Sequence, residues 1–460
     1  MYRVNAWEQY DESGRTQLER FASDYKAWLN SAKTEREAAA ASEKLCRERG
    51  FADLDELIRS GTVLKPGDRV FCKWMDKCVM AFVIGSEPLA RGMRILGAHI
   101  DSPRVDVKQN PLYEDEGIGY LDTHYYGGIK KYLWAATPLA LHGVVIRKDG
   151  SRLDLAVGEK DDDPVFCFSD LLIHLSGELM AKPARDVVPG ESLNLIVGSV
   201  PLKGEEKDAV KAGLLQLLKE RYALEEEDFL SAELEIVPAG RARDLGLDRG
   251  MILGYGHDDR VCAYPSLRAV ADYEGTPERT LCAVLTDKEE IGSVGATGMD
   301  SNYFENTVAE LLNACGEPGS LALRRCLRNS AMLSSDVSAG FDPNFASSFE
   351  KKNTAILGRG VCFNKFTGRG GKSGSSDANP EFIARLRGIM DEAGVAWQSG
   401  EIGRVDAGGG GTIAYMCAKY GMDVIDCGVP VLSMHSLYEV ASKADLWEAY
   451  RGYRAFLEKA

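Results

Sequence analysis

The chain has 460 residues, of which 45% are hydrophobic and 27% charged, and its formal net charge is −15. This composition is typical of a globular protein with two or more domains, or with one large domain that carries an insertion. The acidic balance argues against nucleic acid or an anionic membrane as a partner, because both require clustered Lys and Arg. No segment reaches about 18 uninterrupted apolar residues, which argues against a transmembrane helix.

The N-terminal segment and the cysteines bear on the compartment. Residues 1–21, "MYRVNAWEQYDESGRTQLERF", are charged early and lack the apolar stretch of a signal peptide. The 11 cysteines are scattered singly, without a CxxC pair. We therefore expect a cytoplasmic protein with reduced thiols, rather than one with structural disulfides or a cysteine-based zinc site.

The first part of the chain predicts helices and then strands. Residues 15–50 have apolar positions at three- and four-residue spacing, which predicts two helices that connect near Asn30 to Thr34 and end at Gly50. The β runs "RVFCKW", "CVMAFVIG" and "RILGAHI" follow. Residues 106–244 contain their own strands and a helix at "EKDAVKAGLLQLLKERYAL". We interpret them as an inserted domain that divides the main domain into 1–105 and 245–460.

From residue 250 onward, strand-like and helix-like segments alternate. The apolar runs "LCAVLTD" and "SAMLSSD" end in acidic residues, and "MDVIDCGVPVLSMHS" contains His435 near its end. The helical segments "NPEFIARLRGIMDEAG" and "TIAYMCAKYG" are each closed by a glycine. This alternation predicts an α/β layer with a mostly parallel sheet.

Five segments place His, Asp or Glu at a strand end or directly after a turn, where open α/β sheets bind ligands. They are "GAHID", "GYGHDDR", "LTDKEEIGS", "LSSDVSAG" and "LSMHSLYE". Singly, each has a simpler explanation: His99 as a hydrogen-bonded core histidine, Asp258 as a helix cap, and Glu289 with Glu290 as a charged turn. His435 resists such an explanation, because it interrupts an apolar strand end. Together, the segments predict a pair of divalent ions such as zinc, manganese or cobalt.

Two pairs of neighbouring residues add chemistry to this prediction. In Glu289–Glu290, one carboxylate can bind a metal while the other remains free to move a proton. His99 and Asp101 face the same side of an extended strand. The Asp101 carboxylate can therefore hold the imidazole nitrogen that does not bind metal, which fixes the tautomer.

Two glycine-rich segments allow other interpretations. "FTGRGGKSGSS" contains GKS, but the phosphate-binding loop pattern needs glycine where this chain has Phe366, which argues against a nucleotide site. "DAGGGGTIAYMCAKYG" places four glycines before a helix. This run is either a tight turn or a backbone site in which Gly410 holds a carbonyl or a developing oxyanion.

The motifs "GAHIDSPR", "GYGHDDRVC", "DKEEIGS", "SSDVSAGFDPN", "GGGGT" and "PVLSMHSLYE" occur in this order. From about residue 60 to 450, the chain thereby resembles a bacterial-type member of the aspartyl aminopeptidase family of dizinc metallopeptidases. The resemblance implies a three-layer α/β sandwich of the zinc-exopeptidase type, with a mixed, mostly parallel sheet, interrupted by a β-rich dimerisation domain. It also implies a homo-oligomer in which dimers assemble into a tetrahedral dodecamer.

The implied activity is removal of the N-terminal residue of peptides, with a preference for Asp or Glu. Water activated by two divalent ions, zinc or alternatively cobalt or manganese, would attack the first peptide bond. Glu289 would be the general base, and Asp101 would orient a ligand. The implied metal ligands are His99, Asp258, Glu290, Asp336 and His435.

Within this ligand set, the resemblance also assigns the individual ions. His99 and Asp336 would hold one ion, and Glu290 and His435 the other. Asp258 would bridge them, since the bridging aspartate of the family is the first of its Asp-Asp or Asp-Asn pair.

The substrate pocket follows the family pattern less closely. His174 in "DLLIHL" matches a histidine that reaches the active site of the neighbouring subunit, and Lys365 in "VCFNKF" matches a lysine that receives the acidic side chain. Ala339 stands where eukaryotic members have histidine, and "GRGGKSGSS" replaces their "QRY" element. The acidic preference is therefore left open, with Arg369 or Lys372 as other sources of positive charge. The alternatives are a related dizinc exopeptidase or deacylase with neutral or basic preference, and a catalytically silent assembly protein.

Overall fold

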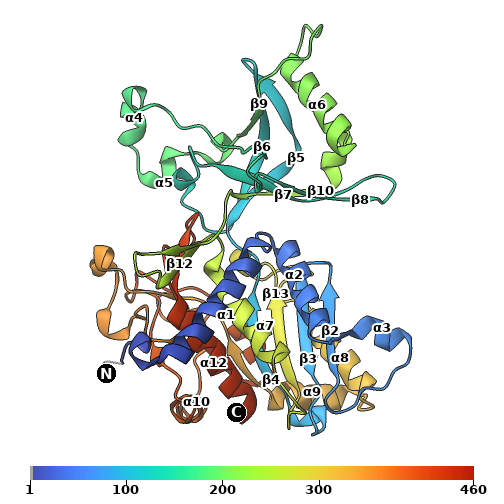
Figure 1. Cartoon of the computed structure of the whole chain (residues 1–460), viewed down its shortest axis with the longest axis vertical. Coiled ribbons are helices and arrows are strands. Elements are labelled where there is room, and N and C mark those ends of the chain that lie inside the picture. Colours follow the sequence, from blue (N-terminus) through green and yellow to red (C-terminus); the bar gives the residue numbers. More distant parts are fainter. Residues whose placement is uncertain (1–3) are drawn as a thin grey trace. The chain divides into compact units, whose positions relative to one another are not determined.

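The computed structural model describes residues 4–460, so residues 1–3, at the start of the segment compared with signal peptides, lie outside it. The chain forms two compact units, each with its own sheet and hydrophobic core (Figure 1). Among the described residues, no helix combines the length and the apolar character that a membrane span requires. The main unit comprises the chain up to Ser102, Ala242–Met434 and Glu439–Ala460, and the inserted unit comprises Pro103–Arg241 and His435–Tyr438.

The main unit is built on a mixed sheet, which has nine strands within the described residues. Five neighbouring pairs run parallel, and three run antiparallel. The predicted mixed, mostly parallel sheet is thereby confirmed. In spatial order the strands are β1 (Ala52–Asp53), β2 (Arg69–Trp74), β3 (Cys78–Val83), β13 (Leu281–Thr286), β4 (Arg94–His99), β14 (Ala331–Ser334), β18 (Asp423–Gly428), β16 (Val361–Asn364) and β17 (Trp397–Ser399).

Helices pack on both faces of this sheet, which gives the predicted three layers. Successive side chains of a strand point to opposite faces, so Leu96 of β4 belongs to one core and Ile95 to the other. The Leu96 core contains residues of α1 (Glu12–Asn30), α2 (Glu35–Glu48), α7 (His257–Ala271), α10 (Pro380–Glu392) and α12 (Lys443–Lys459). The Ile95 core contains residues of α8 (Tyr303–Ala314), α9 (Ser320–Asn329) and α11 (Ala414–Ala418).

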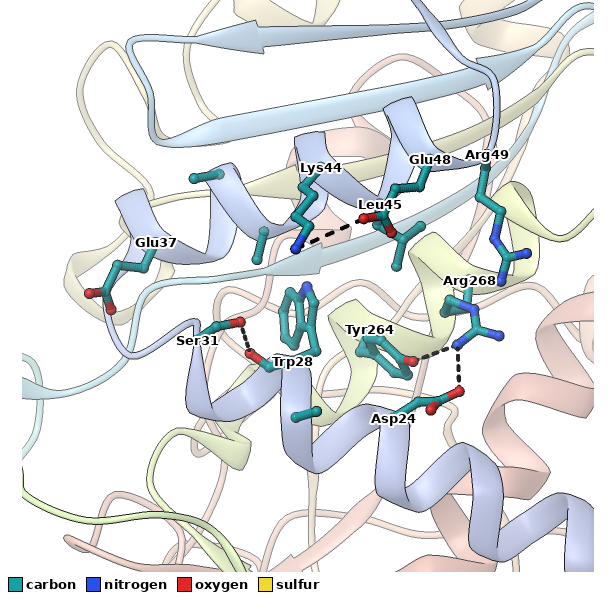
Figure 2. Close-up of a pocket in the computed structure, with 13 residues that line it drawn as sticks. Asp24, Trp28, Ser31, Glu37, Lys44, Leu45, Glu48, Arg49, Tyr264 and Arg268 are labelled. Carbon is teal, nitrogen blue, oxygen red and sulfur yellow. Dashed lines mark hydrogen bonds and ion pairs between the residues drawn. The ribbon is translucent and has the colours of Figure 1, made fainter. Parts of the chain in front are cut away.

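The connection between the two N-terminal helices lies where the sequence pattern predicts it. α1 ends at Asn30, and α2 begins after Thr34, whose side chain forms a capping box with Glu37. Trp28 of α1 packs on Tyr264 of α7, with ring centroids 5.4 Å apart. A pocket of about 710 Å³ lies between α1, α2 and α7 (Figure 2). None of the residues predicted for the functional site lines this pocket.

A smaller sheet of the main unit, with five strands in the part of the chain that the structure describes, gathers segments that are far apart in the sequence. One of its strands precedes Asp258, another follows Asp336, and a third leads toward the His435 segment. The sheet therefore fixes the ends of loops that carry predicted site residues. Its strands, in spatial order, are β11 (Arg243–Leu245), β12 (Met251–Gly254), β20 (Glu439–Ser442), β19 (Pro430–Leu432) and β15 (Ser338–Ala339).

The inserted unit is β-rich, as the fold class predicts. Its antiparallel sheet packs its own apolar core, to which α6 (Ala209–Tyr222) contributes Leu214 and Leu218. Short helical turns follow β8, among them η4 (Ile173–Leu175) and α4 (Gly177–Met180). In spatial order the strands are β8 (Arg152–Val157), β7 (Leu139–Ile146), β10 (Ala232–Pro238), β5 (Arg104–Asp115), β6 (Ile118–Tyr126) and β9 (Leu195–Gly198).

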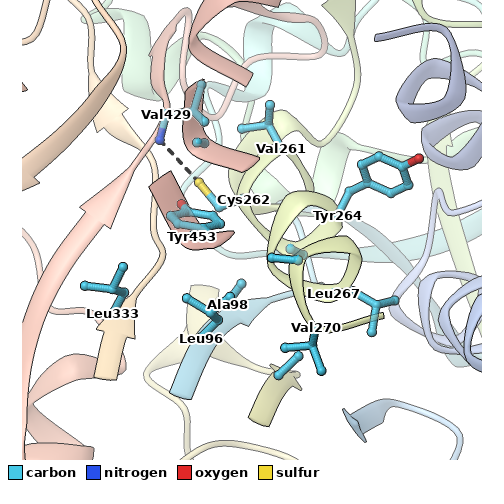
Figure 3. Packing of buried hydrophobic residues seen from close by; sticks show 14 of the residues in the cluster. Leu96, Ala98, Val261, Cys262, Tyr264, Leu267, Val270, Leu333, Val429 and Tyr453 are labelled. Atoms are coloured by element: carbon cyan, nitrogen blue, oxygen red, sulfur yellow. Dashed lines mark hydrogen bonds between the residues drawn. The ribbon is translucent and has the colours of Figure 1, made fainter. Parts of the chain in front are cut away.

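Leu96 of β4 offers a test of the main core. Figure 3 shows it with Leu267 and Val270 of α7, and its side chain is fully buried. We expect Leu96→Ala to lower the free energy of unfolding by about 2–5 kcal/mol, because a cavity replaces buried methyl groups. Urea denaturation measures this change. Leu321→Ala, on the exposed side of α9, should cost less than about 0.5 kcal/mol, and equal losses in the two variants would contradict the packing described.

Candidate metal centre and active site

Three adjacent parallel strands end together at one edge of the main sheet. β4 lies between β13 and β14, and His99 is the register partner of Thr286. His99 ends β4, Glu289 and Glu290 lie just beyond β13, and Asp336 lies just beyond β14. Because parallel strands present their carboxyl ends at the same edge, the sheet itself brings these polar side chains together.

Asp258 reaches the same place from the first turn of α7. A cis peptide bond joins it to Asp259. The Asp258 N–H donates to Glu439 Oε2 over 2.9 Å, and the Ser102 hydroxyl donates to the Asp258 carbonyl over 2.6 Å. These two contacts fix the turn between β12 and α7. They thereby fix the backbone from which the Asp258 carboxylate extends.

The side chains from these four segments converge on His99. Its Nε2 lies 3.2 Å from Asp258 Oδ1 and 3.9 Å from Glu289 Oε2. Potential ligand atoms fall into overlapping groups within which all lie less than 4.8 Å apart. Two of these groups contain the His99 imidazole. One is His99 with Glu289 and Asp336, and the other is His99 with Asp258 and Glu290.

Asp101 connects the ends of β4 and β13. Its Oδ1 lies 3.2 Å from His99 Nδ1, the contact anticipated from the sequence. Its two carboxylate oxygens also accept the backbone N–H groups of Glu289 and Glu290, each over 3.2 Å. Asp101 therefore orients the imidazole and also fixes the backbone that carries both glutamates. The contacts with Glu289 and Glu290 join neighbouring strands, so no sequence pattern predicts them.

The electrostatics of this cluster suit cations. Burial lowers the pKa of His99, but hydrogen bonds with Asp101 and Asp258 outweigh it and raise that pKa well above its usual value. Desolvation raises the pKa of Asp336, and the charges of Asp259 and Glu289 raise it further. Without bound metal ions, the cluster therefore holds protons that divalent cations would displace. One imidazole with several carboxylates is also a donor set that suits zinc, cobalt or manganese.

The remaining predicted residues are not members of these groups of potential ligands. His435 follows β19, and its Nδ1 lies 3.0 Å from the Gly128 carbonyl within the inserted unit, so its role as a ligand stays a prediction. His174 is exposed on η4 of the inserted unit. Lys365 is exposed directly after β16, and Gly410 lies in the coil before α11.

The sequence analysis did not single out Ser102 or Glu439, which hold the Asp258 turn. Glu439 is the last residue of the quoted motif "PVLSMHSLYE" and begins β20, where its side chain is only 2% exposed. Ser102 lies within the quoted motif "GAHIDSPR", but only its contact with Asp258 reveals its role.

Comparison with known proteins decides the family. The family model described as aminopeptidase I zinc metalloprotease (M18) matches residues 28–457. The chain belongs to this family. A probable M18 family aminopeptidase 1 of Clostridium acetobutylicum is 53% identical over 98% of this chain and 97% of its own length. The predicted family and the assignment as a zinc metalloaminopeptidase are thereby confirmed.

Solved structures agree with this assignment. The crystal structure of an M18 aminopeptidase from Thermotoga maritima has a TM-score of 0.95 and 42% identity, and the match covers 100% of both chains. A structure of the S. cerevisiae mApe1 dodecamer has a TM-score of 0.76 and 19% identity, over 96% of this chain and 97% of that one. At that identity, the yeast structure supports the fold alone.

The double role of Asp101 predicts an effect on metal binding. We expect Asp101→Asn to weaken zinc affinity by about 10- to 100-fold, because the amide has no negative charge and replaces one of the two acceptor oxygens by a donor. Titration against a competing chelator measures the affinity. Asp161→Asn, which alters an exposed acid of the inserted unit, serves as the control. Equal affinity in Asp101→Asn and the wild type would remove Asp101 from this role.

The raised pKa values of His99 and Asp336 predict a pH dependence of metal binding. Zinc requires the neutral imidazole and ionised carboxylates, so it must displace protons that the cluster holds below these raised pKa values. We expect zinc affinity to rise by more than about tenfold between about pH 5.5 and about pH 7.5. Calorimetry in buffers with different ionisation heats should show proton release. A pH-independent affinity without proton release would contradict this description.

Proposed function

We propose that this M18 zinc metalloaminopeptidase hydrolyses the first peptide bond of its substrates at a two-metal centre, with Glu289 as the general base. The observation that supports this most strongly is the convergence of His99, Asp258, Glu289, Glu290 and Asp336 from four separate segments. Bound ions would polarise the scissile carbonyl and promote ionisation of the attacking water. Glu289 Oε2 would accept the proton of that water and return it to the leaving amine.

Charge supports two ions rather than one. Once ionised, the carboxylates of Asp258, Glu289, Glu290 and Asp336 carry four negative charges around a single imidazole. One divalent ion would offset half of that charge, whereas two would offset all of it. We assign His99 and Asp336 to one ion and Glu290 to the other, with Asp258 between them. His435 completes the second set by its match to the family motif.

Zinc loading tests this assignment directly. Elemental analysis of the purified, zinc-saturated protein should give two ions per chain, and chelation should abolish activity that zinc, cobalt or manganese then restores. We expect Glu290→Gln to lose part of the bound zinc, because this substitution removes an ionised ligand. A single ion per chain in a fully active enzyme would contradict the two-metal proposal.

Glu289→Gln separates the base from the ligands. We expect this variant to keep its zinc and its oligomeric state while kcat falls by about 10²- to 10⁴-fold, because the amide cannot accept the proton. Steady-state kinetics and zinc analysis on the same sample measure both properties. The adjacent Glu290→Gln is the matched control, since it should lose zinc. Wild-type kcat in Glu289→Gln would exclude Glu289 as the base.

We propose a preference for N-terminal Asp or Glu, with Lys365 as the cation that receives the side chain. Lys365 is exposed and forms no ion pair with the described residues. The ammonium of Lys372 is less suitable, since it lies 3.6 Å from Asp377 Oδ2 and 3.8 Å from the centre of the Phe366 ring. Arg369 is exposed in the same loop and remains a second source of positive charge.

One observation favours a neutral or basic preference instead. The pocket of about 390 Å³ between the two glycine-rich loops is lined by the cations Lys372 and Arg404 but also by the acids Glu401 and Asp406. This balance offers no net attraction for a carboxylate. A panel of N-terminal residues, assayed with defined metals, distinguishes the two preferences.

Faster cleavage of N-acyl amino acids than of free-amine peptides would identify a deacylase. No cleavage by the fully metallated protein would favour a silent assembly protein.

The surroundings of His174 support a homo-oligomer. The segment 171–180 exposes several large apolar side chains, with Ile173 at 68% and Met180 at 70% exposure. Exposed apolar segments of this kind are typical of protein–protein contacts. We propose that the inserted unit forms a dimer in which His174 reaches the active site of the neighbouring subunit. Dimers would assemble into a dodecamer, the state named for yeast mApe1, and light scattering would measure the subunit count.

Mixed oligomers test the shared site. We expect neither His174→Ala nor Glu289→Gln to be active alone, whereas oligomers reassembled from both should recover part of the wild-type kcat. Recovery follows because some sites then combine an intact Glu289 with His174 of the partner. Native mass spectrometry verifies that mixing occurred. Absence of recovery in verified mixed oligomers would show that each site is built within one chain.

A further inference from the structure

Asp426 is a buried carboxylate of the main sheet that the mechanism above does not use. It lies in β18 and is 1% exposed. Its Oδ1 accepts hydrogen bonds from the Ser334 hydroxyl over 3.0 Å and from the Thr412 hydroxyl over 2.6 Å. Its Oδ2 has no hydrogen-bond partner among residues 4–460. A buried carboxylate is costly, so the question is what the two hydroxyl contacts achieve.

One contact leads to the metal centre. Ser334 is the register partner of Asp426 in the parallel pair β14–β18, and the ligand candidate Asp336 follows two residues later. Gly428, at the end of β18, permits a close approach there, because a Cβ atom at this position would lie 1.8 Å from the Asp336 carbonyl oxygen. β18 and Ser334 therefore fix the point at which the Asp336 segment leaves the sheet.

The other contact leads to the glycine run 408–411. Thr412 follows this run directly, and its hydroxyl also accepts the Ala414 N–H over 3.3 Å, at the start of α11. The run is joined to the second glycine-rich loop, since Gly368 N–H donates to the Gly410 carbonyl over 2.7 Å. Glycines have no side chains with which to fix their own position, so the Thr412 hydroxyl is a natural anchor for this segment.

We infer that Asp426 is a positioning residue, which fixes the 408–411 segment relative to Asp336 through the hydroxyl groups of Thr412 and Ser334. The inference rests on the proposed function, together with the interpretation of the sequence in which the backbone at Gly410 holds a carbonyl or a developing oxyanion. Both hydroxyls donate to the same oxygen atom of Asp426. This atom therefore sets the distance between the loop and the β14 strand. Burial raises the pKa of Asp426, and the hydrogen bonds from Thr412 and Ser334 partly oppose this rise, so that the pKa is about 6. The group is therefore a carboxylate at neutral pH.

Thr412→Val tests the inference, because valine keeps the shape of threonine but removes the hydroxyl, with its bond to Asp426 and the weaker one from the Ala414 N–H. We expect kcat to fall by about 10- to 100-fold, since small displacements of groups that hold the reacting carbonyl cost rate. KM should change by less than about threefold, because the loop acts on the transition state more than on binding. Zinc content should equal that of the wild type. Hydrogen exchange of peptides that cover residues 403–413 should become faster.

Two variants separate positioning from a loss of stability. Thr412→Ser keeps the hydroxyl and should recover most of the wild-type kcat. Tyr453→Phe removes a buried hydrogen bond of 2.9 Å to the carbonyl of Cys427, the neighbour of Asp426 in β18, but does not touch the loop. It should lower the melting temperature without changing kcat or exchange in the loop.

The inference is overturned if Thr412→Val keeps the wild-type kcat or leaves loop exchange unchanged, or if Tyr453→Phe lowers kcat equally. Failure of the proposed function has a different signature, in which the fully metallated wild type cleaves no N-terminal residue. The exchange comparison then still shows whether Thr412 anchors the loop.

Discussion

The main unit depends on one electrostatic constraint, which is the accumulation of carboxylates around His99 at the end of buried strands. The carboxylates come from three separate parts of the chain, and they would not be stable there without a compensating charge. The raised pKa of Asp336 expresses this imbalance in the protein itself. The fold therefore creates a demand for cations, and membership in a zinc metalloprotease family fits that demand.

Much of this arrangement is encoded in local sequence. The apolar run that ends at His99 predicts a buried strand with a polar end, and β4 is that strand. The runs before Glu289 and Asp336 become β13 and β14, because short apolar segments between turns pack as central strands. Spacing alone also places Asp101 beside the imidazole, since alternate residues of an extended chain share a side.

What local sequence does not contain is which strands become neighbours. The second role of Asp101 depends on β13 pairing with β4, and the role of Asp426 depends on β18 pairing with β14. A buried aspartate within an apolar strand is a visible anomaly in "DVIDCG", but its partners Ser334 and Thr412 lie far from it in the sequence. The glycine-rich loops are hard to predict for another reason, because residues without side chains leave no pattern of burial.

The order of strands in the main sheet has a consequence for synthesis. β4 is made early, but its neighbours β13 and β14 are translated only after residues 103–241 of the inserted unit, and β18 later still. Such non-local pairing is slow, and it cannot begin until the distant segments exist. A nascent chain therefore carries His99 for most of its elongation without the carboxylates that complete the cluster. In the proposed function, the growing chain therefore lacks peptidase activity until these segments exist.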